Sequence, residues 1–152
     1  MTTKIDSIAD LKERVGQHLG YSEWHQVTQE QVNLFADATG DHQWIHVDVE
    51  KAKAGPFGAP IAHGYLTLSL TPTLISEAFQ VSGISMGINY GLNKLRFPSP
   101  VPVGSKVRAG VELASVEDAS GGATQVQLNV TYEIEGGSKP VCVAEVLFRY
   151  YS

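Results

Sequence analysis

An aspartate and a histidine stand five positions apart in this chain, directly behind a glycine. The segment from Gly40 to His46 reads GDHQWIH. A carboxylate and an imidazole at this spacing can divide acid and base roles, because histidine titrates near neutral pH and the carboxylate can orient it or deprotonate a water molecule. Asp41 and His46 are therefore the first candidates for catalysis, and the sequence leaves open which is the base and which the acid.

A second segment, from Ala59 to Tyr65, reads APIAHGY and is typical of a loop that enters a helix. Gly64 would lie at the helix start, where the backbone N–H has no partner within the helix and faces the positive end of the helix dipole. Glycine at this place also lets a ligand approach the backbone closely. The two segments together suit proton transfer around a carbonyl whose oxygen gains negative charge.

Each candidate also has a structural interpretation. Asp41 could be a turn residue that bonds its own backbone, His46 a half-buried histidine, and Gly64 a packing residue. The order of all three along the chain favours a functional site. Asp41, His42, His46 and His63 could in principle bind zinc, but proton transfer around a carbonyl requires no metal and we predict none.

The overall composition excludes several classes of partner. With 43% hydrophobic and 18% charged residues, the 152-residue chain is typical of one folded domain with a substantial core. The net charge is −5 and no basic block is present, which argues against nucleic acid as a partner. Cys142 is the single cysteine, so neither an internal disulfide nor a zinc–thiolate site can form.

We expect a cytoplasmic protein with no membrane segment. The N-terminal residues carry charges at short intervals and lack the apolar core of an export signal. The longest apolar-rich stretch, from Gly64 to Phe79, is interrupted by polar residues and is too short to span a bilayer.

The first half of the chain is predicted to be mainly helical. We expect a short helix capped by Ser7 and running to Val15, and a short strand from Tyr21 to Val27. A capping-box pattern starts a longer helix at Thr28, which Gly40 ends in a left-handed conformation. A helix would place the candidate aspartate and histidine on different faces, so we expect a loop to hold the pair.

The segment from His63 to Phe79 has leucines at the four-residue spacing of a helix, although Pro72 and a local alternation of leucines oppose that interpretation. Its apolar residues point in several directions, which predicts a helix covered on most sides.

The second half is predicted to be β-structure. Apolar and polar residues alternate over Ile84–Leu92, Val107–Leu113 and Val126–Ile134, with a shift before Leu95 as at a β-bulge. Paired glycines at 121–122 and 136–137 mark two hairpin turns. Val141–Tyr150 is nearly continuously apolar, like a central strand. An antiparallel meander covered by one long helix is an α+β architecture.

These residues resemble the MaoC-like dehydratase family, which includes the (R)-specific enoyl-CoA hydratases. The family pattern is Gly-Asp, Asn-Pro, an apolar residue and His. The chain matches it at Gly40-Asp41 and Ile45-His46, while Gln43-Trp44 replaces Asn-Pro. The segments IAHGY at 61–65 and LRFPSPVPVG at 95–104 are similar to the branch of nodulation protein N-like hydratases. The resemblance covers nearly the whole chain from Gly16 onward.

The resemblance implies one hot-dog domain over residues 1–152, in which an antiparallel sheet wraps a central helix at His63–Phe79. It implies a homodimer whose sheets join edge to edge, with active sites near the interface. It also implies reversible (R)-specific hydration of 2-enoyl thioesters, in which Asp41 and His46 act on one water molecule and Gly64 donates to the thioester oxygen. Coenzyme A or a carrier-protein phosphopantetheine would be part of the substrate, with no metal and no further cofactor.

Four more residues are expected near the substrate. His63 would shape the turn before the helix, and Tyr65 follows at the helix start. Asn89 and Gly91 either line the acyl pocket from a strand or are ordinary sheet residues.

Two other functions stay open at the level of sequence. A hot-dog thioesterase would need a carboxylate on the central helix, where Glu77 is the only acid, far from the helix start. An acyl-thioester-binding subunit without catalysis is the third possibility, because Trp44 is bulky and could narrow the pocket. The acyl chain length, the carrier and the pathway are not determined by the sequence.

Overall fold

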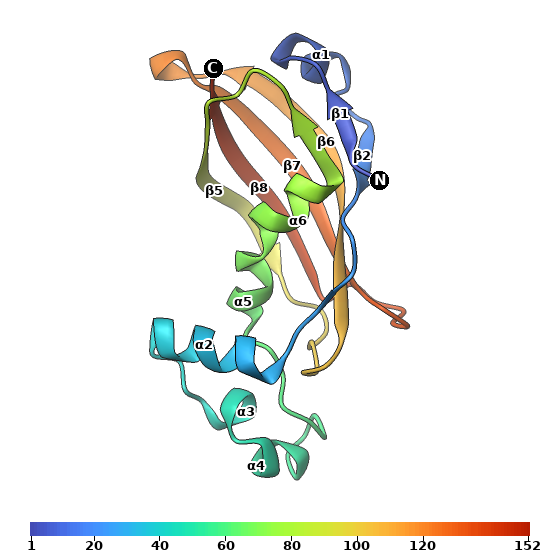
Figure 1. The fold of residues 1–152 in the computed structure, drawn as a ribbon, viewed down its shortest axis with the longest axis vertical. Helices are drawn as coiled ribbons and strands as arrows, with labels where there is room; N and C mark the ends of the chain where they lie inside the picture. The colour runs from blue at the N-terminus through green and yellow to red at the C-terminus, as the bar shows by residue number, and fades with distance from the viewer.

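A long antiparallel sheet curls around a central helical segment, and a group of shorter helices closes one end of the molecule (Figure 1). The computed structural model describes all residues from Met1 to Ser152. Its main sheet has the strand order β2-β6-β7-β8-β5, and β3 also pairs with β6. The strands of this sheet are β2 (His18–Tyr21), β3 (His25–Gln26), β5 (Met86–Arg96), β6 (Lys106–Asp118), β7 (Thr124–Ile134) and β8 (Cys142–Tyr151). The predicted α+β architecture and hot-dog fold are confirmed.

The alternating sequence pattern predicted the long strands correctly, and β6 and β7 each have one buried face. The register of β5 shifts between Leu92 and Lys94, close to the predicted bulge, and again between Asn89 and Gly91. Strand β8 lies between β7 and β5, as predicted for a central strand, and its residues alternate between buried and partly exposed.

The central segment contains two helices instead of the single predicted one. Helix α5 (Gly64–Ser69) ends at Leu70, and α6 (Thr71–Ala78) follows directly. Pro72 has no N–H to donate to the Leu68 carbonyl, and the Thr71 hydroxyl donates to that carbonyl instead. Thr71 also bonds the hydroxyl of Tyr132 on β7, which ties the start of α6 to the sheet.

The N-terminal segment adds a small second sheet. Strand β1 (Thr3–Ile5) pairs in parallel with β4 (Phe79–Val81), directly after α6. Helix α1 (Ile8–Glu13) begins after the predicted cap Ser7 and ends before Val15.

The single strand predicted at Tyr21–Val27 is wrong. Strands β2 and β3 are separate, and only the second lies wholly within that range. Ser22 lies between β2 and β3, and its hydroxyl oxygen accepts the N–H of Ala109 on β6. At this point a side chain replaces a backbone acceptor in the pairing with β6.

Helix α2 (Gln29–Thr39) has the predicted ends. The Thr28 hydroxyl oxygen accepts the N–H of Gln31, and Gly40 ends the helix with φ 82°. Two short helices, α3 (Trp44–Val47) and α4 (Val49–Lys53), follow at the same end of the molecule (Figure 1).

One side of the molecule remains open within a single chain. The core residues of β6, β7 and α6 are fully covered, whereas β5 is exposed along almost its whole length. The central helices also expose a stripe at Tyr65, Ser69, Thr73 and Ser76, so they are covered on fewer sides than expected. None of the helices combines the length and apolarity that crossing a bilayer requires.

Candidate active site

Asp41, His46 and His63 converge at the end of the molecule closed by α2, α3 and α4. One polar side-chain atom from each lies within 4.8 Å of the others. His46 and His63 are buried, with 6% and 3% of their surface exposed, while Asp41 is exposed to solvent. A water molecule bonds at about 2.8 Å, so one water can contact two groups at this separation. The predicted convergence of Asp41 and His46 is therefore present.

The His46 ring has a defined tautomer. Its Nδ1 lies 2.7 Å from the carbonyl oxygen of Ile61, and a carbonyl only accepts, so Nδ1 carries the hydrogen. In the neutral ring the lone pair is then on Nε2. Burial lowers the pKa of His46 below its ordinary value of 6.5, and the neighbouring His63 lowers it further, against the opposing effects of the Ile61 carbonyl and the Asp41 carboxylate. His46 is thus held as a neutral imidazole with an unprotonated Nε2.

The backbone around the pair differs from the predicted loop. Asp41 does lie on irregular chain after Gly40, and its Oδ1 accepts the N–H of Gln43 at 3.4 Å. His46, however, lies on α3, a single helical turn. Asp41 and His46 are brought together by the bend between α2 and α3. Within this bend, Gln43 has extended backbone just before α3 begins.

Helix α2 holds α3 in place through one side chain. The Nε2 of Gln29, the first residue of α2, donates to the main-chain carbonyl of His46 at 2.8 Å and to Asn33 at 2.9 Å. Sequence analysis did not identify Gln29, because its contact spans seventeen positions and no local pattern marks it.

His63 contacts both candidate catalytic residues. Its ring stacks on that of His46 with centroids 3.9 Å apart and planes inclined by 23°. Its Nε2 donates to the main-chain carbonyl of Asp41 at 3.0 Å, and Phe35 of α2 lies against it with a centroid distance of 4.8 Å. The sequence predicted that His63 lies near the substrate and shapes the turn before the helix, but it did not predict these two contacts.

Gly64 is the first residue of α5, as predicted. Its N–H forms no hydrogen bond within the chain and is free to donate. A Cβ at this position would meet the Phe97 ring at 2.9 Å, so any larger residue would require that ring to move. Gly64 and Phe97 both line a cavity of about 290 Å³, on the side of α5 that faces residues 97–101.

The other predicted substrate residues do not join the histidine cluster. Tyr65 is 66% exposed, and its ring lies edge-on to that of Phe97 with the centroids 6.0 Å apart. Asn89 and Gly91 line a different cavity of about 360 Å³, between the central helices and strands β5 and β8. That cavity is lined by none of the three cluster residues, so the structure does not bring these positions together with Asp41.

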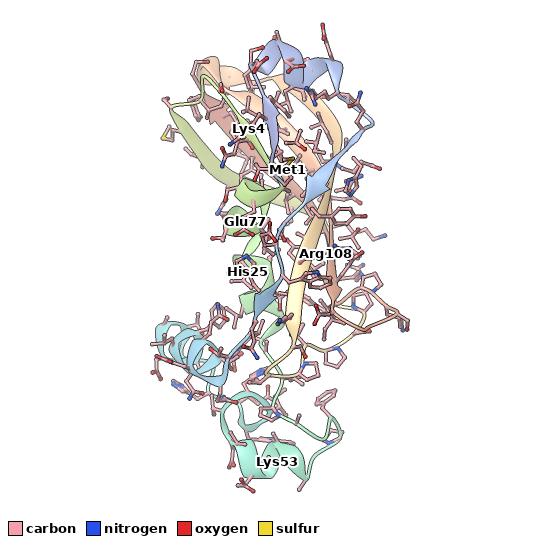
Figure 2. The ribbon with its side chains drawn as sticks, turned by 45° about the vertical axis from the view of Figure 1, so that its right-hand side comes forward. Met1, Lys4, His25, Lys53, Glu77 and Arg108 are labelled. Atoms are coloured by element: carbon pink, nitrogen blue, oxygen red, sulfur yellow. The ribbon has the colours of Figure 1, made fainter.

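Several residues weighed in the sequence have structural partners. Exposed His42 lies 2.9 Å from Asp37. Glu77 lies 2.7 Å from His25, and Figure 2 shows this pair midway along the molecule, far from the end that carries Lys53. The Trp44 ring packs against Gly55 and beneath the Lys51 ammonium group, whose nitrogen is 4.8 Å from the ring centroid. Trp44 thus belongs to the packing of α3 on α4.

The stacked rings are not oriented to bind one metal ion together, although the polar atoms of the cluster lie close to one another. An imidazole binds a metal through a lone pair in the plane of its ring. The rings of His46 and His63 are nearly parallel and 3.9 Å apart, so their lone pairs do not converge on one point.

Known proteins resemble this chain over most of its length. The family model described as MaoC like domain matches residues 10–135. The 3-hydroxyacyl-thioester dehydratase Z of Mycobacterium tuberculosis is 57% identical, over 96% of this chain and 97% of that protein. Nodulation protein N of Rhizobium leguminosarum is 45% identical, over 91% and 87%.

Solved structures agree with these sequence relationships. The R-hydratase PhaJ1 from Pseudomonas aeruginosa has a TM-score of 0.75 at 25% identity, over 96% of this chain and 86% of that one. The residues matched by the family model include Asp41, His46 and Gly64. The chain belongs to the MaoC-like domain family.

Proposed function

We propose that this protein catalyses the reversible (R)-specific hydration of trans-2-enoyl thioesters to (R)-3-hydroxyacyl thioesters. The observation that carries the proposal is the convergence of Asp41 and His46, with polar atoms within 4.8 Å and His46 held as a neutral imidazole. The high identity to a 3-hydroxyacyl-thioester dehydratase supports this reaction, and the likeness to an R-hydratase supports its stereochemistry.

In the proposed mechanism Asp41 and His46 bind one water molecule between them. The water oxygen forms a bond to C3 of the substrate as one of the two residues takes its proton. C2 then receives that same proton from this residue, while the other residue orients the water molecule, so one water is added in total and both residues end in their starting state. The lone pair on Nε2 makes His46 a suitable base, and proton transfer by a positioned group contributes roughly 10²- to 10⁴-fold.

Gly64 supplies the remaining requirement, a donor to the thioester oxygen. That oxygen gains negative charge as C3 is attacked, and the free N–H at the start of α5 can donate to it. Coenzyme A or phosphopantetheine is the handle of the substrate, and we propose that the reaction uses neither a metal nor a further cofactor. Dialysis against a chelator is therefore expected to leave the rate unchanged.

The direct test is an assay of the purified protein with crotonyl-CoA. Hydration removes the absorbance of the enoyl thioester while no free thiol appears. Release of thiol would instead indicate a thioesterase, and neither signal with crotonyl-CoA or with longer enoyl thioesters would indicate a binding subunit. The thioesterase alternative has little support, because its one helical carboxylate, Glu77, is paired with His25.

The exposed face of β5 supports a homodimer. Met86, Ile88, Tyr90 and Leu92 are between 42% and 53% exposed on an edge strand that pairs only with β8. An edge strand with unpaired backbone groups and exposed apolar side chains is suited to pairing with a second copy. A partner there would also lie beside the exposed stripe of the central helices.

A further inference from the structure

His63 touches both residues of the proposed acid–base pair, yet no step of the proposed reaction uses it. Its ring is almost wholly buried, with 3% of its surface exposed, between Phe35 on one side and His46 on the other. The Nδ1 of His63 is buried without a hydrogen-bond partner, which costs free energy that a purely structural role does not explain. A specific role for this side chain is therefore expected.

The hydrogen bond of His63 fixes the backbone of Asp41. The carbonyl oxygen of Asp41 only accepts, so the Nε2 of His63, 3.0 Å away, carries the hydrogen. The Asp41 carbonyl is in this way attached to the residue that precedes α5. Asp41 otherwise has weak local support, since its own N–H lies 3.5 Å from the Thr39 hydroxyl and its Oδ1 lies 3.4 Å from the Gln43 N–H.

The stacking contact fixes the other member of the pair. The hydrogen bond from His46 Nδ1 to the Ile61 carbonyl fixes one atom of the ring. The ring could still rotate about this hydrogen bond unless its neighbours prevent it. The face of His63 at a centroid distance of 3.9 Å prevents the His46 ring from tilting on that side. One imidazole thus contacts the ring of one catalytic candidate and the backbone of the other.

We infer that His63 is a positioning residue, which keeps Asp41 and the His46 imidazole in register for one water molecule through a hydrogen bond to the main-chain carbonyl of Asp41 and a ring stack on His46. The inference rests on the proposed function, since it assigns the two partners of His63 to catalysis. His63 itself contacts no reacting atom in this scheme. A displacement of about 1 Å at a reacting group can lower a rate by roughly 10²-fold, so such support is large enough to measure.

Two substitutions separate the two contacts. His63→Phe keeps an aromatic face against His46 and Phe35 but removes the donor to Asp41. His63→Gln can still donate to the Asp41 carbonyl but has no ring to stack. We expect each variant to lower kcat on crotonyl-CoA by roughly 10- to 100-fold with KM changed by less than about threefold. The control is His18→Gln on β2, which lies on an exposed edge of the sheet and should keep the wild-type kcat.

The pH profile distinguishes positioning of the pair from general support of the fold. Asp41 and His63 are the titratable groups whose charges act on His46, and the charge of His63 lowers the pKa of His46. Replacing His63 by Phe or Gln removes that effect, so the pKa of His46 rises. The acid limb of kcat/KM should therefore move to higher pH in both variants, which a loss of folded protein alone would not produce.

A measurement on the unaltered protein covers the case in which the variants do not fold. Nitrogen-15 NMR of the imidazoles reports which ring nitrogen carries the hydrogen. We expect Nε2–H for His63 and Nδ1–H for His46 at neutral pH. An Nδ1–H tautomer for His63 would overturn the inference, because its Nε2 could not then donate to Asp41.

The kinetic outcomes separate this inference from the proposed function. The role of His63 would be overturned if its folded variants kept the wild-type kcat and an unmoved acid limb. If His46→Gln were inactive in the same assay, the proposed function would still stand. Full activity of both Asp41→Asn and His46→Gln would overturn the proposed function, and the inference with it.

Discussion

The imidazole of His46 is held neutral and oriented by its surroundings before any substrate is present. The Ile61 carbonyl occupies Nδ1, Gln29 fixes the main chain of the residue, and burial disfavours the charged ring. A base of this kind combines a defined direction with a lone pair that is available at neutral pH. The same burial has a consequence for stability that can be measured without substrate.

We predict that the protonation of His46 makes the folded state less stable in mild acid. Burial lowers the pKa of the His46 ring in the folded state. At pH values between that lowered pKa and 6.5, the unfolded chain therefore binds more protons than the folded one. The free energy of unfolding should therefore fall as the pH is lowered through that range. Urea denaturation at pH 7 and pH 5 should show a smaller loss for His46→Gln than for the wild type. An identical loss in both proteins would contradict the assignment, and His18→Gln serves as the matched histidine control.

At the scale of elements, the segment 61–64, which leads into α5, places three groups at one end of the sheet. It carries the carbonyl that orients His46, the ring of His63 and the free N–H of Gly64. The Phe97 ring, just after β5, packs directly on the start of α5. The helix start is thus fixed against the sheet on one side and against the histidine cluster on the other.

We predict that Gly64→Ala lowers both stability and activity, because its Cβ would lie 2.9 Å from the Phe97 ring. Overpacking of this kind typically costs about 1–3 kcal/mol. The double variant Gly64→Ala/Phe97→Leu should recover stability by making room, as thermal melting would show. Its hydration rate should stay below that of Phe97→Leu alone if close approach to the Gly64 N–H matters. Equal rates for these two variants would make the role of Gly64 one of packing only.

The elements that the sequence predicted correctly are those with local signals. The helix ends at Thr28 and Gly40 are decided by side-chain capping and by the left-handed backbone that glycine adopts. The long strands follow from alternation between a buried and an exposed face. Asp41, His46 and Gly64 could likewise be selected from residue type and spacing.

The features that were missed depend on contacts between distant segments. Pro72 was a local signal against one continuous helix, but the break at Leu70 is also held by the hydroxyl of Tyr132, and the gap between β2 and β3 by a side chain bonded to β6. His63 stacks on a ring seventeen positions earlier. No local pattern encodes such contacts, because they arise only when the segments are packed together.

At the scale of the whole molecule, the distribution of exposed apolar side chains is uneven. The core is closed around β6, β7 and α6, whereas the apolar residues of β5 face solvent on an unpaired edge. An exposed apolar edge of this length favours association. The proposed homodimer would cover it and border the cavity lined by Asn89 and Gly91.

We predict that the protein sediments as a dimer and that Ile88→Glu shifts it to a monomer. Ile88 is 42% exposed on β5, and a charge there would have to be desolvated if a second copy covered the strand. The matched control is Val15→Glu, at a position 47% exposed outside β5, which should remain dimeric. Sedimentation velocity of the three proteins at equal concentration makes the comparison. A wild-type monomer, or dissociation caused equally by both substitutions, would contradict an interface at β5.

The most direct measurement is the hydration rate of crotonyl-CoA by the wild type, Asp41→Asn, His46→Gln and the double variant. If the two residues act on one water molecule, each single substitution should lower kcat by roughly 10²- to 10⁴-fold. The double variant should then be little slower than the slower single variant, because residues that act as a unit are not additive. Full activity in either single variant, with the fold intact by circular dichroism, would contradict the shared-water site.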